Sequence, residues 1–131
     1  RIVFVNTEKG TIYRMDSDGS NIEVLADVTR LGGRAELSPD GRYLAYFAGL
    51  PEARQIYLLD LTSGERRQLT AEGDNYTPTF SPDGGWLGFS SYGFGEKRHG
   101  LCKIYKMRLD GSEKQQLSTN PLCDWLPNWG P

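Results

Sequence analysis

The sequence predicts an all-β fold, a β-propeller of four-stranded antiparallel blades, with three blades in 131 residues. Two observations support this prediction. Three segments share Ile-Tyr, a later Gly and a final Leu: TIYRMDSDGSNIEVL from Thr11, QIYLLDLTSGERRQL from Gln55 and KIYKMRLDGSEKQQL from Lys103, at intervals of 44 and 48 residues. The turn sequence Ser-Pro-Asp-Gly occurs at Ser38 and again at Ser81, 43 residues later. A repeat of this length, made of short strands, is typical of propeller blades.

One complete repeat contains four predicted strands joined by turns. Residues 34–37 lead into the first Ser-Pro-Asp-Gly turn, where Pro presets the backbone, Asp caps the turn and Gly takes the positive φ. Residues 42–47 return as the second strand, and residues 55–61 form the third. The fourth strand, ERRQLT from Glu65, is polar and suits the exposed outer edge of a blade.

The same criteria place strands along the whole chain. They are expected near 1–5, 11–16 and 21–25, as two complete sets within 34–70 and 77–117, and as a lone first strand at 125–129. We therefore expect one propeller segment, 1–131, with repeat units of about 1–33, 34–76 and 77–131. No segment sustains a helical period, so no helix is expected.

The repeated motifs resemble those of a known family. LSPDGRYLAY, FSPDGGWLGF and the pattern Ile-Tyr-x-x-Asp-x-x-x-Gly make the chain similar to TolB-like β-propellers, which are related to WD-type propellers. The resemblance covers essentially the whole chain, but Gly130-Pro131 stands where the other units have Ser-Pro-Asp-Gly. It implies a ring of six blades, of which three blades would be half. Closed propellers have about four to eight blades, so three need completion.

Two routes to ring completion remain open at this stage. The missing blades can belong to a longer chain, or two copies can assemble head to tail. In the second case the lone first strand, 125–129, would pair with residues 1–5 of the other copy. Such a contact would be cyclic and twofold, and it would cover strand edges that otherwise invite aggregation.

The function expected from this resemblance is a non-catalytic binding or scaffold module that recognises proteins, peptides or small ligands at the channel mouth. Some relatives make envelope or periplasmic protein contacts, which slightly favours a periplasmic or extracellular location. Others are propellers fused to serine peptidases, or sugar lyases that use channel histidines and metals. The alternative function is therefore a propeller domain of a larger enzyme of one of these types.

The residues themselves give little support to catalysis. The chain has one histidine, His99, in the glycine-rich stretch GFGEKRHG, and it has no Gly-x-Ser-x-Gly motif. That stretch lacks the Gly-Lys-Ser/Thr ending of a phosphate-binding loop. The acidic MDSDGS at residues 15–20 lies where the other repeats have a hairpin turn, so backbone geometry explains it better than calcium binding. No enzyme activity, cofactor or metal site is expected.

Composition excludes several classes of partner. The net charge of −2 gives no overall basic face for nucleic acid. Residues 96–114 carry six basic and three acidic side chains, which a solvated strand edge explains. The apolar runs are only a few residues long, so neither membrane insertion nor a signal peptide within the chain is expected.

The two cysteines, Cys102 and Cys123, leave two interpretations open. Their spacing of 21 positions fits no metal-binding motif. They would form one disulfide in an oxidising compartment, or two buried thiols otherwise. The length of the chain slightly favours free thiols, because a core of this size does not need a cross-link.

Aromatic residues suggest where a ligand would bind. Tyr76 and Trp125 precede their first strands at equivalent places, in NYTPTF and DWLPNW. The connection between the fourth strand and the next first strand faces one end of a propeller channel, so these side chains are candidates for its mouth, although packing beneath the loop also explains them. The candidate binding residues are Asp74, Asn75, Tyr76, Asp124, Trp125, Arg34 and His99.

Overall fold

The computed structural model describes residues 1–94 and 100–130, and within these residues it contains eleven strands and no helix. The strands are β1 (Ile2–Asn6), β2 (Thr11–Met15), β3 (Glu23–Asp27), β4 (Leu31–Leu37), β5 (Tyr43–Ala48), β6 (Gln55–Asp60), β7 (Arg66–Gln68), β8 (Asn75–Phe80), β9 (Trp86–Ser91), β10 (Lys103–Arg108) and β11 (Gln115–Gln116). The predicted all-β class is confirmed.

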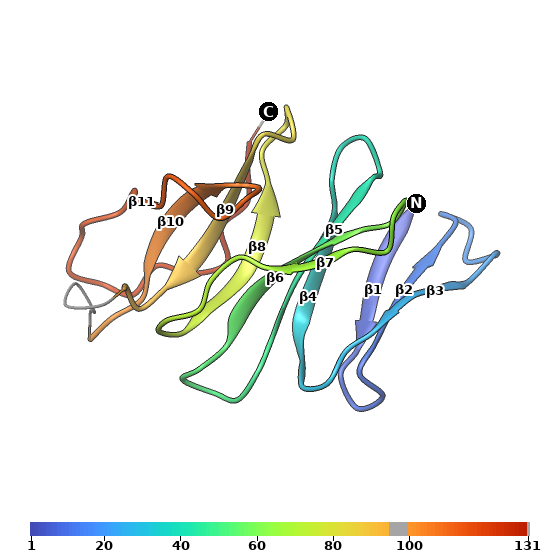
Figure 1. Cartoon of the computed structure of the whole chain (residues 1–131), viewed down its shortest axis with the longest axis horizontal. Helices are drawn as coiled ribbons and strands as arrows, with labels where there is room; N and C mark the ends of the chain where they lie inside the picture. The colour runs from blue at the N-terminus through green and yellow to red at the C-terminus, as the bar shows by residue number, and fades with distance from the viewer. Residues whose placement is uncertain (95–99, 131) are drawn as a thin grey trace.

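The strands form three separate antiparallel sheets that follow one another like the blades of a fan (Figure 1). The first sheet has the order β1-β2-β3, the second β4-β5-β6-β7 and the third β8-β9-β10-β11. Each sheet is a meander of sequence neighbours, as in a propeller blade. The propeller prediction is therefore confirmed.

The predicted lone strand at 125–129 is wrong, because these residues have no strand conformation. A strand is defined by ladder hydrogen bonds to a neighbour, and within the described residues this segment has no such neighbour. Pro127 also lacks the N–H group that a ladder needs. The segment nevertheless lies against the third sheet, where the Trp129 indole N–H donates to the Thr79 carbonyl at 3.1 Å.

The Ser-Pro-Asp-Gly turns have the same geometry in both repeats. Ser38 Oγ donates to Asp40 Oδ1 at 2.6 Å and accepts the Tyr43 N–H at 2.9 Å, while Gly41 has a φ of 75°. Ser81 and Asp83 make the corresponding bond, also at 2.6 Å. The hydroxyl and carboxylate thus replace missing backbone partners in a turn that requires a positive φ.

Each sheet has a leading face toward the preceding sheet and a trailing face toward the following one. On the leading face of the second sheet, Leu44 and Tyr46 pack with Ile12 of the first sheet in one core. On its trailing face, Ala45 and Phe47 pack in a second core that includes the third sheet. Successive residues of β5 serve different cores because side chains alternate along a strand.

The innermost strands of neighbouring blades are also joined directly. Glu36 of β4 accepts the Phe80 N–H at 3.0 Å and the Thr79 hydroxyl at 3.3 Å through Oε1. Its other carboxylate oxygen pairs with Arg34 at 3.3 Å. A side chain of β4 therefore satisfies a backbone donor of β8 and fixes the spacing between the two blades.

Candidate functional site

One backbone hydrogen bond recurs where each blade meets the connection to the next, and we call this place the blade corner. The three copies are Val28 N–H to Gly10 O (2.7 Å), Asn75 N–H to Arg54 O (2.9 Å) and Asp124 N–H to Cys102 O (2.9 Å). Each joins the residue before β2, β6 or β10 to a residue that follows the last strand of the same blade. The side chains at these corners are therefore structurally equivalent.

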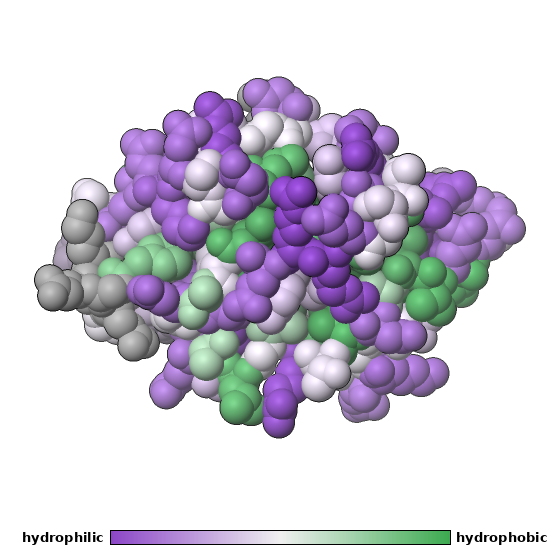
Figure 2. Space-filling model, in the orientation of Figure 1, coloured by the Kyte–Doolittle hydropathy of each residue, from purple (hydrophilic) through white to green (hydrophobic). Residues whose placement is uncertain are grey.

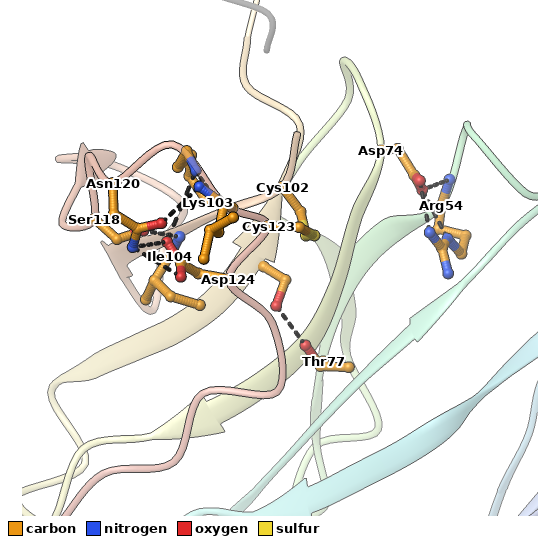
Figure 3. The surroundings of a disulfide bond; sticks show 12 residues. Arg54, Asp74, Thr77, Cys102, Lys103, Ile104, Ser118, Asn120, Cys123 and Asp124 are labelled. Atoms are coloured by element: carbon orange, nitrogen blue, oxygen red, sulfur yellow. Dashed lines mark hydrogen bonds and ion pairs between the residues drawn. A yellow bond between two sulfur atoms is a disulfide. The ribbon is translucent and has the colours of Figure 1, made fainter. Parts of the chain in front are cut away.

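The second blade corner is closed by an ion pair between Arg54 and Asp74 (Figure 3). Arg54 Nη2 lies 2.6 Å from Asp74 Oδ2, and Nε lies 2.7 Å from Oδ1. The hydrogen bond to Asp74 raises the pKa of Arg54 above its usual value. The guanidinium also lies 4.1 Å from the centre of the Tyr76 ring, and burial raises the pKa of Tyr76 to about 12.

The third blade corner is closed by a disulfide between Cys102 and Cys123, with Cα atoms 4.6 Å apart (Figure 3). The slight preference for free thiols was therefore wrong. The cysteines occupy the places of Arg54 and Asp74, which face each other across the corner. Their contact follows from blade geometry, which the spacing of the two cysteines does not reveal.

Polar contacts surround this disulfide. Lys103 lies 3.8 Å from the Asp124 carboxylate and donates to the Leu122 carbonyl. Hydrogen bonds from Asn120, at 2.8 and 2.9 Å, lower the pKa of Asp124, and Ser118 and Lys103 act in the same direction. Asp124 is therefore an anion held within a network, with its side chain partly exposed.

The structure divides the predicted binding residues between two corners. Asp74, Asn75 and Tyr76 belong to the second corner and are buried. The Asn75 amide donates to Gln55 Oε1 and to the Glu72 carbonyl, so these three residues support the corner rather than open onto solvent. Asp124 and Trp125 belong to the third corner, where 61% of Trp125 is exposed.

The two remaining predicted residues lie elsewhere. Arg34 is half-buried within β4 and pairs with Glu36. It therefore forms part of the contact between inner strands described above. His99 lies outside the described residues.

An exposed apolar patch at the third corner was missed by the sequence analysis. It consists of Leu101, Leu122, Trp125 and Leu126, whose exposed fractions are 45%, 71%, 61% and 47%. We call it the corner patch. Leu101 and Leu122 directly precede Cys102 and Cys123, the two cysteines that the disulfide joins. No hydrophobic periodicity marks these leucines, and only the cysteine pairing would have located them.

A hollow of about 260 Å³ lies between the second and third blades. It is lined by Arg42, Tyr43, Leu58, Asp60, Glu65, Arg67, Leu109 and Asp110. Arg42 and Asp60 pair at 3.0 Å, and this hydrogen bond lowers the pKa of Asp60 to about 2. Arg42 and Asp60, two of the charged side chains that line the hollow, therefore already have partners.

In residues 1–94 and 100–130, no three His, Cys, Asp or Glu side chains are grouped so that they would hold a metal ion. No helix in the same residues has the length and apolar character needed to cross a bilayer.

Comparison with known proteins agrees with the blade architecture. The family described as the TolB beta propeller domain matches residues 1–131. The chain belongs to this family. A TolB homolog from Chlorobium chlorochromatii is 31% identical over 135 aligned positions, which cover 100% of this chain and 29% of the relative. An uncharacterized protein from Agrobacterium fabrum is 36% identical over 95 residues, which cover 72% of this chain and 31% of the relative.

The chain thus spans about a third of the length of these curated relatives. A solved structure assigned to TolB from Agrobacterium tumefaciens is 32% identical, with a TM-score of 0.76 over 92% of this chain and 42% of that chain. The chain is also similar to part of a protein from Streptomyces coelicolor that is named as a homolog of tricorn protease; the two are 27% identical over 95% of this chain and 11% of that relative.

Proposed function

We propose that this TolB-type propeller segment is a non-catalytic binding or scaffold module that recognises a protein or peptide. The corner patch carries this proposal, because it exposes a tryptophan and three leucines beside a rigid cross-link. Exposed apolar patches with an aromatic anchor are typical of protein interaction sites. Asp124 and Lys103 add polar groups at its edge.

The proposed location is the periplasm. The disulfide supports this location, because such bonds persist in oxidising compartments. Several relatives are named Tol-Pal system protein TolB, which is consistent with an envelope role for this chain.

The module is proposed to act within a closed ring. Among the described residues, β1 is an edge strand and segment 125–129 has no ladder partner. Further blades of a longer protein or a second copy of this chain would satisfy both edges.

Peptide binding tests the proposed function. Peptides selected from a display library on the immobilised chain should lose at least about tenfold in affinity for the double variant Leu122→Ser, Trp125→Ser. The matched control is Ile22→Ser, which removes a side chain of the same exposure, 61%, from the turn before β3. Equal affinity of the double variant and the control would refute recognition at the corner patch.

A propeller domain of a larger serine peptidase or sugar lyase remains the second candidate. The tricorn-type relative favours the peptidase form of this alternative. The purified chain can be assayed for peptide hydrolysis and polysaccharide cleavage. An activity that copurifies with the chain through further fractionation would favour the enzyme-domain alternative over the binding module.

A further inference from the structure

The hollow between the second and third blades lies at the end of the sheets opposite to the blade corners. Its border includes Arg42 before β5, Glu65 in the β6–β7 turn and Asp110 in the β10–β11 turn. Successive turns of an antiparallel meander alternate between its two ends, and the corner residues Arg54 and Cys102 precede β6 and β10 at the other end. Both walls of the hollow are sheets that the structure describes, so the hollow is a feature of the joint between two consecutive blades.

The hollow has an apolar floor and a charged rim. Leu58, which is 4% exposed, and the partly buried Tyr43 and Leu109 form the floor and belong to the core beneath it. Figure 2 shows hydrophilic side chains over the middle of the molecule, where Figure 1 places β7. Pockets for drug-sized ligands have about 300–1,000 Å³, so this smaller hollow suits a single side chain. The rim carries two cations and three anions: Arg42, Arg67, Asp60, Glu65 and Asp110.

Two carboxylate oxygens of the rim can still accept a hydrogen bond. Arg67 Nε donates to Glu65 Oε1 at 3.1 Å. Asp110 accepts the hydroxyl and the N–H of Ser112 through Oδ1, at 2.5 and 2.9 Å, and these bonds lower the pKa of Asp110. Among the described residues, no group donates to Glu65 Oε2 or Asp110 Oδ2. The rim therefore offers two anionic acceptors to a cation.

The repeat shows what kind of side chain takes this place in the other blades. Leu58 follows the Ile-Tyr motif, and the residue after that motif is Arg14 in the first blade and Lys106 in the third. All three lie on a strand paired on both sides within its sheet. The Arg14 guanidinium pairs with the Glu23 carboxylate at 2.6 Å, and Lys106 Nζ lies 4.2 Å from the Trp86 ring centre. Of the three blades, the second alone lacks a cation of its own at this position, and there the hollow opens.

We propose that the hollow receives a lysine side chain of a partner protein, in the place where the other two blades carry a basic side chain of their own. The aliphatic stem would lie on Leu58 and Leu109, and the ammonium would donate to Glu65 Oε2 and Asp110 Oδ2. These oxygens belong to different carboxylates, which suits the compact ammonium of lysine better than the planar fork of arginine. The site goes beyond recognition at the corner patch, which lies at the other end of the blades.

Titration with a lysine peptide tests the proposal. The probe is a pentapeptide with a central lysine, flanking alanines and blocked ends, and the readout is the set of amide chemical shifts of the isotope-labelled chain. The shifts of Leu58, Leu109 and Asp110 should change and saturate. Raising the salt concentration from about 0.05 M to about 0.5 M should weaken binding, because salt screens exposed charges. The same peptide with norleucine keeps the stem, lacks the ammonium and should not bind there.

Matched variants locate the ammonium. Asp110→Asn keeps an oxygen for the Ser112 N–H but removes the charge, and should raise the dissociation constant of the lysine peptide about threefold. The control is Asp18→Asn, because Asp18 accepts the Ser20 N–H at 2.9 Å in the equivalent turn of the first blade, as Asp110 does in the third. It should leave the constant unchanged. Leu58→Lys gives the second blade the residue type of the third, and should fill the hollow and abolish binding.

Four outcomes would overturn the proposal. The first is no saturable binding of the lysine peptide to the wild-type chain, and the second is equal binding of the lysine and norleucine peptides. Equal dissociation constants for Asp110→Asn and Asp18→Asn would place the ammonium elsewhere. Tighter binding of cadaverine, the free diamine, than of the peptide would assign the hollow to free amines. The double variant Leu122→Ser, Trp125→Ser should bind the lysine peptide as the wild type does, which separates this site from the corner patch.

Discussion

Removing the disulfide tests whether the blade corners are energetically equivalent. Replacing both Cys102 and Cys123 by alanine releases a bond between positions 21 residues apart. The loop-entropy relation gives a loss of about 3 kcal/mol in the free energy of unfolding for a loop of this length. Urea denaturation followed by tryptophan fluorescence measures this loss, provided that the slope of the transition is unchanged.

The ion pair of the second corner provides the complementary variant. Cys102→Arg combined with Cys123→Asp should rebuild the pair that Arg54 and Asp74 form with contacts of 2.6 and 2.7 Å. Charge-assisted hydrogen bonds contribute about 1.5–3 kcal/mol, and desolvation offsets part of this, so we expect recovery of about 1–2 kcal/mol relative to alanine. The reversed pair, Cys102→Asp with Cys123→Arg, is the control. An Arg–Asp variant no more stable than the alanine variant would refute the equivalence.

Three further predictions concern stability. Phe89→Ala should lower the free energy of unfolding by about 3–5 kcal/mol in the same assay, because Phe89 is fully buried. Raising the pH from about 10 to about 12 should lower the free energy of unfolding, because buried Tyr76 ionises at a higher pH in the folded chain than in the unfolded chain. Denaturation series at several pH values should show a smaller loss of this free energy for Tyr76→Phe. Gly73→Ala should lower the melting temperature more than Gly19→Ala, since both have a positive φ but only at Gly73 would a Cβ lie 2.6 Å from a carbonyl oxygen.

The sheets could be predicted from the repeat because neighbouring strands are determined by residues close together in the sequence. Alternation and the turn at Ser38 determine neighbouring strands, and the second copy at Ser81 shows that the unit recurs. Strand ends were less predictable, since the fourth strands keep only three and two ladder residues. Their ends depend on neighbouring hydrogen bonds rather than on side-chain preference.

The candidate site depended on contacts that periodicity does not encode. Tyr76 was a candidate for a channel mouth. In the structure, however, the guanidinium of Arg54, the residue before β6, lies over the Tyr76 ring and pairs with Asp74. Trp125, at the equivalent place of the third repeat, is exposed, so its role in binding stays a prediction. Leu122 was missed because its position follows from the disulfide.

The second sheet has a particular consequence for cooperativity, because it forms a wall of both hydrophobic cores. Leu44 and Tyr46 belong to one core, while Ala45 and Phe47 belong to the other. Of the two cores between the described sheets, opening of the first or the third sheet breaks one, but opening of the second sheet breaks both, as nearest-neighbour coupling in repeat proteins requires. Amide hydrogens of β5 and β6 should therefore exchange only through global unfolding, while those of β2 and β10 should also exchange through smaller, blade-wise openings.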